Sequence, residues 1–421
     1  MMSNYKEKVL LLDGEAVQTL IIARTLKSAG YEVHLFCNGT ENYGYHTKYA
    51  SKKTVVKTEP EGDFLKFVKK YVVENRIATI IPMNDEGAVF MSKFKSELVK
   101  LCPILLPDWD IFEKGYDKNL LMALCAQKRY PHPITIDLEK VAYESITEKE
   151  MPFPAIIKPN YTSGGRGMTL VNSPAELSEK YPAIREHYGE CHLQHFVKAG
   201  GKQVKVQVFI DPRDGKTYAS VIHKQRFYPE KGGSSSCNMT IQDDNITDIC
   251  TRVLRDIGWS GFADFDLIED PETHELLIME INPRIPACIK SAILSGMDYG
   301  VMIADVSLGK PLKNYTYKPG KKLRHIGFEV LWFLKSKNRW KTKPCWFNWL
   351  DPNLSFQDFS LRDPMPFFYG TWGNINKMTD PAFRKQKSGL SDSNMNRIVK
   401  TPRWGGGVIP VRVPHVGLLI A

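Results

Sequence analysis

The segment from residue 261 to residue 287, GFADFDLIEDPETHELLIMEINPRIPA, constrains the fold of this 421-residue chain more than any other stretch. Two apolar runs flank the turn-forming sequence EDPETHE, which predicts two neighbouring strands. Side chains alternate between the two faces of a strand, so Asp264 and Asp266 share one face of the first run. Glu280 and Asn282 share one face of the second run for the same reason. The segment therefore predicts a sheet that carries oxygen-bearing side chains on one face.

These side chains have the chemistry of a magnesium site. Asp266, Glu280 and Asn282 are hard oxygen donors, which Mg²⁺ requires, and Mg²⁺ takes few protein ligands when phosphate and water supply the rest. Arg284 follows on the same face, where a guanidinium could stabilise negative charge that develops on a reacting group. The alternative is a solvent-facing strand pair with ordinary salt bridges. The apolar remainder of both strands and the abrupt Asn-Pro-Arg disfavour that alternative.

A second motif, PAIIKPNYTSGGRGMTLV, places Lys158 at the end of an apolar run and before a glycine-rich loop. An unpaired buried ammonium group is costly, so Lys158 must reach water or an anion. Backbone N–H groups of a glycine-rich loop can surround phosphate oxygens. The loop is not a Walker A motif, because no G-K-[ST] closes it. Alone, the motif is equally consistent with a hairpin turn and an exposed lysine.

The first quarter of the chain alternates apolar runs with amphipathic stretches, a rhythm that predicts a parallel sheet covered by helices. We expect strands near residues 9–12, 31–36 and 77–83, and helices near 16–30, 63–76 and 86–101. The first turn lacks G-x-G-x-x-G, so a standard dinucleotide site is not supported. Residues 111–150 predict a helical bridge to the central part of the chain, where a further helix is expected over 246–257.

The composition is that of a globular protein, with 43% hydrophobic and 25% charged residues. No run of about 18 apolar residues predicts a transmembrane helix, and the N-terminal apolar run is too short for a signal peptide. The eight cysteines are scattered without a C-x-x-C pair. Scattered cysteines favour free thiols in a reducing compartment, so we expect a cytoplasmic protein without a Cys/His metal site.

The basic character belongs to the C-terminal quarter. From residue 315 onward there are 18 Lys and Arg against 6 Asp and Glu, whereas the preceding residues hold 39 against 41. Four tryptophans and five basic residues crowd into 328–350, which favours an aromatic-rich packed segment, with peripheral membrane contact as the alternative. Residues 401–421 fit nothing before them and are set apart as a tail, an expression-derived or frame-shifted end being one interpretation.

Together, IIKPNYTSGGRGM, GFADFDLI and IMEINPR resemble the ATP-grasp superfamily, particularly its carbamoyl-phosphate-synthase-like and D-aspartate-ligase-like carboxylate–amine ligases. The resemblance covers about residues 8–310. It implies an α/β and α+β fold with a Rossmann-like pre-ATP-grasp domain and an ATP-grasp domain that combines a lid with an antiparallel-sheet body. The implied boundaries are 1–112 for the first domain, 113–314 for the second with its lid at about 150–195, 315–400 for a basic, aromatic C-terminal extension, and 401–421 for the tail.

The resemblance also implies residue roles. Lys118 and Lys158 would contact nucleotide phosphates, and Lys158 and Arg284 would be the catalytic basic residues. Asp266, Glu280 and Asn282 would bind Mg²⁺, or Mn²⁺ in its place. The remaining nucleotide contacts would come from the closing loop, from the adenine-binding hinge LQHFVKAG and from one strand, namely Ser163, Gly164, Gly165, Gly167, Gln194, His195, Phe196, Val197 and Gln207.

Two positions depart from the family pattern, and four further residues are candidates for the second substrate. Gln194 stands where relatives often carry Glu, and a neutral amide can still accept from the adenine amino group. Lys205 stands where some relatives carry an acidic residue, which leaves the ribose contacts open. The substrate candidates are Arg226, Lys290, Asp85 and Glu86. A surface hairpin explains the Arg226 motif equally well, and a helix N-cap explains Asp85 and Glu86 equally well.

The implied activity is ATP-dependent ligation of a small carboxylate to an amine, such as an amino acid or a peptide-like molecule. Two alternatives remain open: a nucleotide-binding protein without turnover, and a protein that associates with a membrane or polyanion through its basic C-terminal region. No nucleic-acid partner is expected, and a homodimer is one assembly left open. The sequence does not identify the two substrates.

Overall fold

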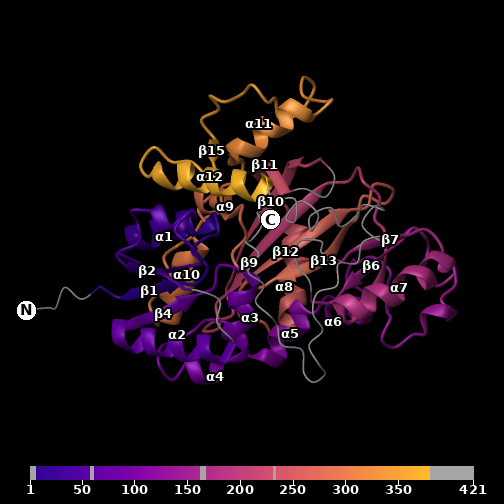
Figure 1. Cartoon of the computed structure of the whole chain (residues 1–421), viewed down its shortest axis with the longest axis horizontal. Coiled ribbons are helices and arrows are strands. Elements are labelled where there is room, and N and C mark those ends of the chain that lie inside the picture. Colours follow the sequence, from indigo (N-terminus) through magenta and orange to yellow (C-terminus); the bar gives the residue numbers. More distant parts are fainter. Residues whose placement is uncertain (1–5, 57–60, 162–166, 231–233, 380–421) are drawn as a thin grey trace, which may run out of the picture. The chain divides into compact units, whose positions relative to one another are not determined.

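The computed structural model describes residues 6–56, 61–161, 167–230 and 234–379. These residues divide into two compact units: a main unit, made of the residues up to Pro133 together with Val197–Gly373, and a small unit, made of Ile134–Phe196 and the described residues from Asn374 onward. Figure 1 shows the chain coloured along its sequence. The tail over 401–421 and the loop residues Ser163, Gly164 and Gly165 lie outside the described residues.

The main unit begins with a four-stranded sheet in the order β3-β2-β1-β4, in which all neighbouring strands are parallel. Its strands are β1 (Lys8–Leu11), β2 (Glu32–Cys37), β3 (Lys52–Val55) and β4 (Ile77–Ile81), and its helices are α1 (Gln18–Ser28), η1 (Gly44–His46), α2 (Glu61–Asn75), α3 (Asp85–Lys93) and α4 (Lys95–Leu98). The helices cover the faces of the sheet, so the central strands β1 and β2 consist mostly of buried apolar residues, with His34 as a buried polar exception. The helix expected over residues 86–101 is interrupted at Phe94.

Glycines end two helices that position the sheets. After α1, Gly30 adopts φ +97°, and the next N–H, that of Tyr31, donates to the Leu26 carbonyl. Gly258 ends the helix that follows residue 244 with φ +84°, and the Trp259 N–H donates to the Leu254 carbonyl. A glycine in the left-handed region satisfies the last carbonyls of a helix without a Cβ clash.

The second part of the main unit is a seven-stranded sheet in the order β13-β12-β9-β10-β11-β14-β15, antiparallel except for the parallel pair β14–β15. Its strands are β9 (Gln203–Ile210), β10 (Thr217–Tyr228), β11 (Ser234–Ile241), β12 (Gly261–Glu269), β13 (Leu276–Asn282), β14 (Lys322–Arg324) and β15 (Leu354–Phe356). The accompanying helices are α5 (Trp109–Tyr116), α6 (Lys118–Lys128), α8 (Asp244–Ile257), α9 (Ile289–Leu294), α10 (Tyr299–Ser307), α11 (Ile326–Lys335) and α12 (Met365–Thr379).

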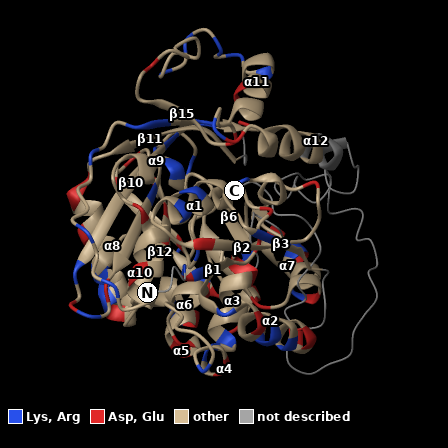
Figure 2. Ribbon diagram, turned by 90° about the vertical axis from the view of Figure 1, so that its left-hand side faces the viewer, with Lys and Arg blue, Asp and Glu red and all other residues tan. Residues whose placement is uncertain are grey.

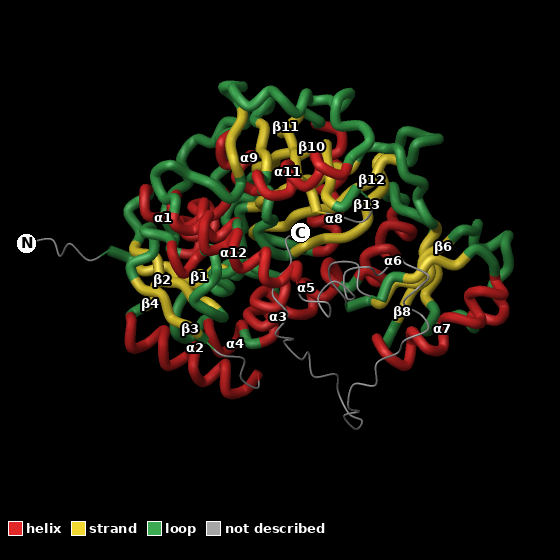
Figure 3. The backbone as a smooth tube through the Cα atoms, turned by 45° about the horizontal axis from the view of Figure 1, so that its top comes forward, coloured by secondary structure: helices red, strands yellow, loops and turns green. Residues whose placement is uncertain are grey.

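The two faces of the seven-stranded sheet differ in chemistry. On one face, the valines of β9 pack with Val253 and Leu254 of α8 and with Phe112 of α5 in one buried cluster. Strand alternation sends the neighbouring residues of β9, including Lys205 and Gln207, to the opposite face. Figure 3 shows α8 and α5 beside this sheet. The helix-covered face is therefore core, and the other face carries the polar residues.

The small unit is a four-stranded antiparallel sheet in the order β5-β8-β6-β7 with one long helix. Its elements are β5 (Thr135–Asp137), η2 (Tyr143–Ser145), β6 (Ala155–Pro159), β7 (Thr169–Val171), α7 (Pro174–Tyr188) and β8 (Cys191–His195). The Ser173 side chain caps α7 by accepting from the Glu176 N–H at 3.2 Å. Ile157, Leu177 and Leu193 are among the buried residues of a separate core.

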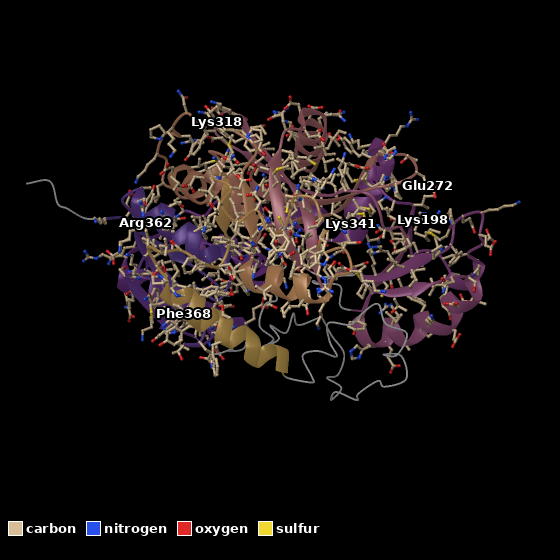
Figure 4. All side chains as sticks on the ribbon, turned by 90° about the horizontal axis from the view of Figure 1, so that it is seen from above. Lys198, Glu272, Lys318, Lys341, Arg362 and Phe368 are labelled. Atoms are coloured by element: carbon tan, nitrogen blue, oxygen red, sulfur yellow. The ribbon has the colours of Figure 1, made fainter. Side chains whose placement is uncertain are left out.

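Residues 315–373 of the main unit extend the seven-stranded sheet and then lie against the N-terminal part. β14 pairs with β11, and the Thr47 hydroxyl donates to Asp363 at 2.5 Å. Lys and Arg residues gather around α11 and β15 (Figure 2). Several aromatic side chains stay exposed, among them Trp340 at 72% and Phe368 at 59%. Figure 4 labels Phe368 on α12. Among the described residues, no helix is both long and apolar enough to span a membrane.

Candidate functional site

Three oxygen donors meet on β12 and β13. In the antiparallel register Asp266 lies opposite Glu280, and Asp264 lies opposite Asn282. The Asn282 amide nitrogen is 3.1 Å from an Asp266 oxygen and 3.5 Å from a Glu280 oxygen. Strand pairing thus brings together the three residues that the sequence assigned to a metal ion.

Two lysines from neighbouring strands neutralise the acidic residues. Lys205 of β9 donates to Asp264 at 2.7 Å and to Asp266 at 2.6 Å, and Lys224 of β10 donates to the other Asp266 oxygen at 2.7 Å. Burial alone would lower the pKa of Lys205, but the two carboxylates outweigh it and raise that pKa. Burial would likewise raise the pKa of Asp266, but Lys205 and Lys224 outweigh it and hold that pKa well below its usual range.

A buried chain of hydrogen bonds holds Asp264 in place. The Gln207 amide donates to Asp264 at 2.7 Å, and its oxygen accepts from the Ser220 hydroxyl at 2.9 Å. The Tyr299 hydroxyl lies 3.0 Å from the Ser220 hydroxyl oxygen. Gln207, a candidate nucleotide contact from sequence, is fully buried and uses both ends of its amide inside the protein.

Arg284, which follows β13, connects Asn282 of that strand to Asp85 of helix α3. Its Nε donates to Asp85 at 3.1 Å, and one terminal nitrogen lies 3.4 Å from the Asn282 side-chain oxygen. Asp85 and Glu86 form the first turn of α3, which Asn84 caps by accepting from the Gly87 N–H at 2.7 Å. Asn84 therefore makes the helix cap, and Asp85 makes the ion pair with Arg284.

Lys118 lies beside Glu280. The side chain of Asp117 caps α6 by accepting the N–H groups of Asn119 and Leu120 at 2.8 and 2.9 Å. This cap fixes the first turn of α6, where the Lys118 ammonium is 3.6 Å from a Glu280 oxygen. The main unit therefore carries Lys118, Asp266, Glu280, Asn282 and Arg284 as one connected group.

The small unit holds a second group of candidate residues. Lys158 of β6 donates to the Gln194 side-chain oxygen on the neighbouring β8, and the Gln194 amide donates to the Thr135 hydroxyl at 3.1 Å. Lys158 and Gln194 are both buried. Gly167 has φ +75°, and a Cβ there would approach Pro159 to 2.8 Å, so the position requires glycine.

The hinge candidates lie where the two units divide, the small unit ending at Phe196 and the main unit resuming at Val197. The His195 N–H donates to the Ile134 carbonyl at 2.8 Å, and the Phe196 N–H donates to the Pro154 carbonyl at 3.0 Å. On the main-unit side, Lys198 pairs with Glu272 at 2.5 Å (Figure 4). Backbone bonds thus hold His195 and Phe196 within the small unit.

Arg226 and Lys290 are engaged by the C-terminal segment. The buried Arg226 guanidinium binds both Glu329 oxygens, from Nε at 2.9 Å and from a terminal nitrogen at 2.5 Å, and also donates to the Pro344 carbonyl at 2.6 Å. The Lys290 ammonium donates to the carbonyls of Phe356 and Phe359. Burial lowers the pKa of Lys290 to about 8. The structure does not bring these two side chains into the group around Glu280.

The donors around Glu280 fit a hard divalent cation in type. Over the residues that the structure describes, no three His, Cys, Asp or Glu are gathered in a way that could hold a metal ion. Two carboxylates and one amide, those of Asp266, Glu280 and Asn282, nevertheless lie on one sheet face. Three protein ligands are enough for Mg²⁺ when phosphate oxygens supply the remaining ligands.

Sequence reasoning assigned no role to Lys224, Ser220 or Tyr299. Ser220 and Lys224 share one face of β10 at even spacing, a signal available from alternation. Tyr299 belongs to α10, which is far from these strands in the sequence. No local sequence pattern could therefore place it beside them.

Comparisons with known proteins show similarity in the central part of the chain and in its fold. Residues 127–315 match the family model described as carbamoyl-phosphate synthase L chain, ATP binding domain. The chain is similar to the biotin carboxylase domain of the 2-oxoglutarate carboxylase of Hydrogenobacter thermophilus, solved with MgADP and bicarbonate (TM-score 0.62, 17% identity, 75% of this chain and 73% of that chain).

Two further solved structures are similar over comparable lengths. One is the N5-carboxyaminoimidazole synthetase of Staphylococcus aureus with ADP (TM-score 0.58, 14% identity, 75% of this chain and 82% of that chain). The other is the L-amino acid ligase of Bacillus licheniformis (TM-score 0.56, 16% identity, 73% and 75%). These findings confirm the predicted resemblance to the ATP-grasp superfamily and a mixed α/β fold of that type.

Proposed function

We propose that this chain is an ATP-dependent ligase that joins a small carboxylate to an amine, a proposal supported by the match of residues 127–315 to the ATP-binding domain of the carbamoyl-phosphate synthase L chain and by the similarity in fold to known ligases and carboxylases. The observation that carries the proposal is the group around Glu280. Glu280 contacts the Asn282 amide and the Lys118 ammonium, and Asn282 in turn contacts Arg284. Carboxylate and amide oxygens suit a Mg²⁺–phosphate complex, and the two basic side chains suit its negative charge.

The proposed reaction has two steps. An oxygen of the substrate carboxylate attacks the γ-phosphorus of ATP, ADP leaves, and an acyl phosphate forms. The amine nitrogen then attacks the acyl carbon, phosphate leaves, and the nitrogen loses a proton. Because no protein nucleophile is needed, the chain supplies positioning and charge stabilisation.

Each group of residues has a proposed part. Asp266, Glu280 and Asn282 are the candidates to hold Mg²⁺, which when bound neutralises phosphate charge. Arg284 stabilises charge on the transferring phosphoryl group, and Lys118 contacts phosphate. In the small unit, Lys158 has the proposed phosphate contact, and Gln194 with the backbone of residues 195–197 has the proposed adenine contact.

We also propose the finer organisation. Residues 1–112, with their parallel sheet, serve as the pre-ATP-grasp domain, 113–314 as the ATP-grasp domain, and 315–400 as an extension of it. Residues 150–195 act as a lid, whose closure would keep water from the acyl phosphate. All eight cysteines are free, which supports a reducing, cytoplasmic location.

A phosphate-release screen tests the proposed activity. The full chain with MgATP is offered pairs of amino acids and other small carboxylates and amines. We expect release with particular pairs only, and we expect Glu280→Ala to lower it at least about 100-fold, as the loss of a metal or oxyanion contact does. Glu275→Ala, an exposed residue at the turn before the same strand, is the matched control and keeps activity.

Folding is followed in the same samples by the melting temperature, which should be similar for both variants, because the Glu280 side chain is 34% exposed. Turnover retained by Glu280→Ala would refute the metal role. Nucleotide binding without ADP or phosphate from any pair would instead indicate a binding protein without turnover.

A further inference from the structure

Lys205 places a fixed positive charge inside the candidate metal site. Its ammonium lies between Asp264 and Asp266, at 2.7 and 2.6 Å, and its side chain is only 7% exposed. The register explains the position, because Lys205 of β9 lies directly opposite Asp266 of β12. A cation therefore already occupies the space between the two carboxylates of β12.

Asp266 has both carboxylate oxygens engaged by protein donors. Oδ2 accepts from Lys205 at 2.6 Å and from the Asn282 amide at 3.1 Å, and Oδ1 accepts from Lys224 at 2.7 Å. A metal ion could bind Asp266 only by displacing a buried ammonium group from it. That displacement is unfavourable, because it would leave a buried lysine next to a second cation.

Glu280 is held much more loosely. Among the described residues, its side chain contacts the Lys118 ammonium at 3.6 Å and the Asn282 amide at 3.5 Å, and it is 34% exposed against 19% for Asp266. Turning the Asn282 amide would present its oxygen beside this carboxylate. Glu280 and Asn282 can therefore accept a divalent ion without breaking a buried ion pair.

We propose that the Lys205 ammonium occupies the position between Asp264 and Asp266 that a second divalent ion could otherwise take, so that the chain binds ATP with a single metal ion held by Glu280 and Asn282. This inference rests on the proposed ATP-dependent function. Lys205 acts as a positioning residue: it neutralises Asp264 and Asp266 and excludes a second metal ion through like-charge repulsion. Of the three candidate metal ligands named above, Asp266 then orients Lys224 instead of binding metal.

Counting bound Mn²⁺ tests the inference without relying on turnover. The full chain is saturated with AMP-PNP, a nonhydrolysable ATP analogue, and titrated with Mn²⁺, with free Mn²⁺ followed by electron paramagnetic resonance. Nucleotide binding is measured in the same samples by equilibrium dialysis. We expect one Mn²⁺ per chain for the wild type and two for Lys205→Gln, in which the two carboxylates lose their fixed cation.

Lys202→Gln is the matched control, because Lys202 directly precedes the same strand and pairs with Glu269 at the surface. It should keep one Mn²⁺ per chain. Two Mn²⁺ in the wild type would overturn the inference without any variant, and one Mn²⁺ in folded Lys205→Gln would overturn the role of Lys205. Failure of the wild type to bind AMP-PNP would overturn the proposed function as well, so the two failures are distinguishable.

Discussion

Arg284 shows how a single residue can link two parts of the main unit. Its planar guanidinium reaches Asp85 through Nε and Asn282 through a terminal nitrogen, and the side chain is buried. A buried guanidinium is stable only when its donors are paired, and these two contacts supply the partners. The geometry holds the charge beside the Glu280 group, where the proposed phosphoryl transfer would need it.

Arg284→Lys should separate charge from geometry. A lysine keeps the positive charge but has one donor centre, so it cannot reach Asp85 and Asn282 together. We expect kcat to fall about 100-fold, in the range of losing one charge-stabilising donor, with a smaller change in KM for ATP. Steady-state phosphate release checks this, with Arg252→Lys on the surface of α8 as the control. An unchanged kcat would show that charge alone suffices.

At the scale of elements, polar contacts join helix α10 to helix α1 and to Tyr31, which follows α1 in the chain. Asp298 caps α10 by accepting from the Val301 N–H at 3.3 Å, and it also accepts from the Thr25 hydroxyl of α1 at 3.1 Å. The Tyr31 hydroxyl donates to Asp305 at 2.5 Å. Burial raises the pKa of Asp298 to about 6, although both hydrogen bonds oppose the rise.

Asp298→Asn should therefore stabilise the fold in a pH-dependent way. The folded pKa lies above the ordinary value of 3.8, so the folded state binds more protons than the unfolded state between about pH 4 and 6. Stability is lost as pH rises through that window, and asparagine avoids the loss while still accepting both hydrogen bonds. We expect the variant to be about 1–2 kcal/mol more stable at pH 7.5, with no such gain at pH 4.

Urea unfolding at the two pH values measures this difference. Asp243→Asn makes the same change at the N-cap of α8 and controls for cap chemistry. A gain for Asp298→Asn that is equal at both pH values would contradict the assignment to a raised pKa.

Across the whole molecule, a buried ion pair ties residues 315–373 to the seven-stranded sheet, in addition to the pairing of β14 with β11. Glu329 of α11 is fully buried between Arg226 and the Ser236 hydroxyl, and Arg324 approaches it at 3.5 Å. The Arg226 guanidinium also lies over the Trp332 ring, 5.2 Å from its centre. The basic residues at this point thus hold the C-terminal segment to the sheet.

Arg226→Met should destabilise the chain by about 3–5 kcal/mol, because it leaves the Glu329 carboxylate buried without its main partner. The double variant Arg226→Met/Glu329→Met removes both charges and should recover most of that loss. Free energies of unfolding in urea measure both effects. Lys198→Met, which breaks an exposed ion pair, should leave stability nearly unchanged. A double variant as unstable as the single one would contradict this role for the pair.

Local sequence patterns were sufficient to predict several strands and helices. The alternating residues 261–287 predicted two strands with oxygen donors on one face, and these are β12 and β13. The apolar runs of the N-terminal quarter predicted β1, β2 and β4, because repeating two-residue and 3.6-residue patterns are encoded by neighbours in sequence. The strand β3 was not expected, since KKTV lacks an apolar run.

Tertiary structure alone decided which side chains meet. Strand register places Lys205 between Asp264 and Asp266, which are about 60 residues further along the chain, and buries Gln207 with both amide ends engaged. It also pairs Arg226 with Glu329. Alternation determines the face on which a residue lies, whereas its partner depends on long-range register and packing. The sequence by itself therefore determined the type of chemistry on this sheet face, and only the folded chain decided which charges are already paired there.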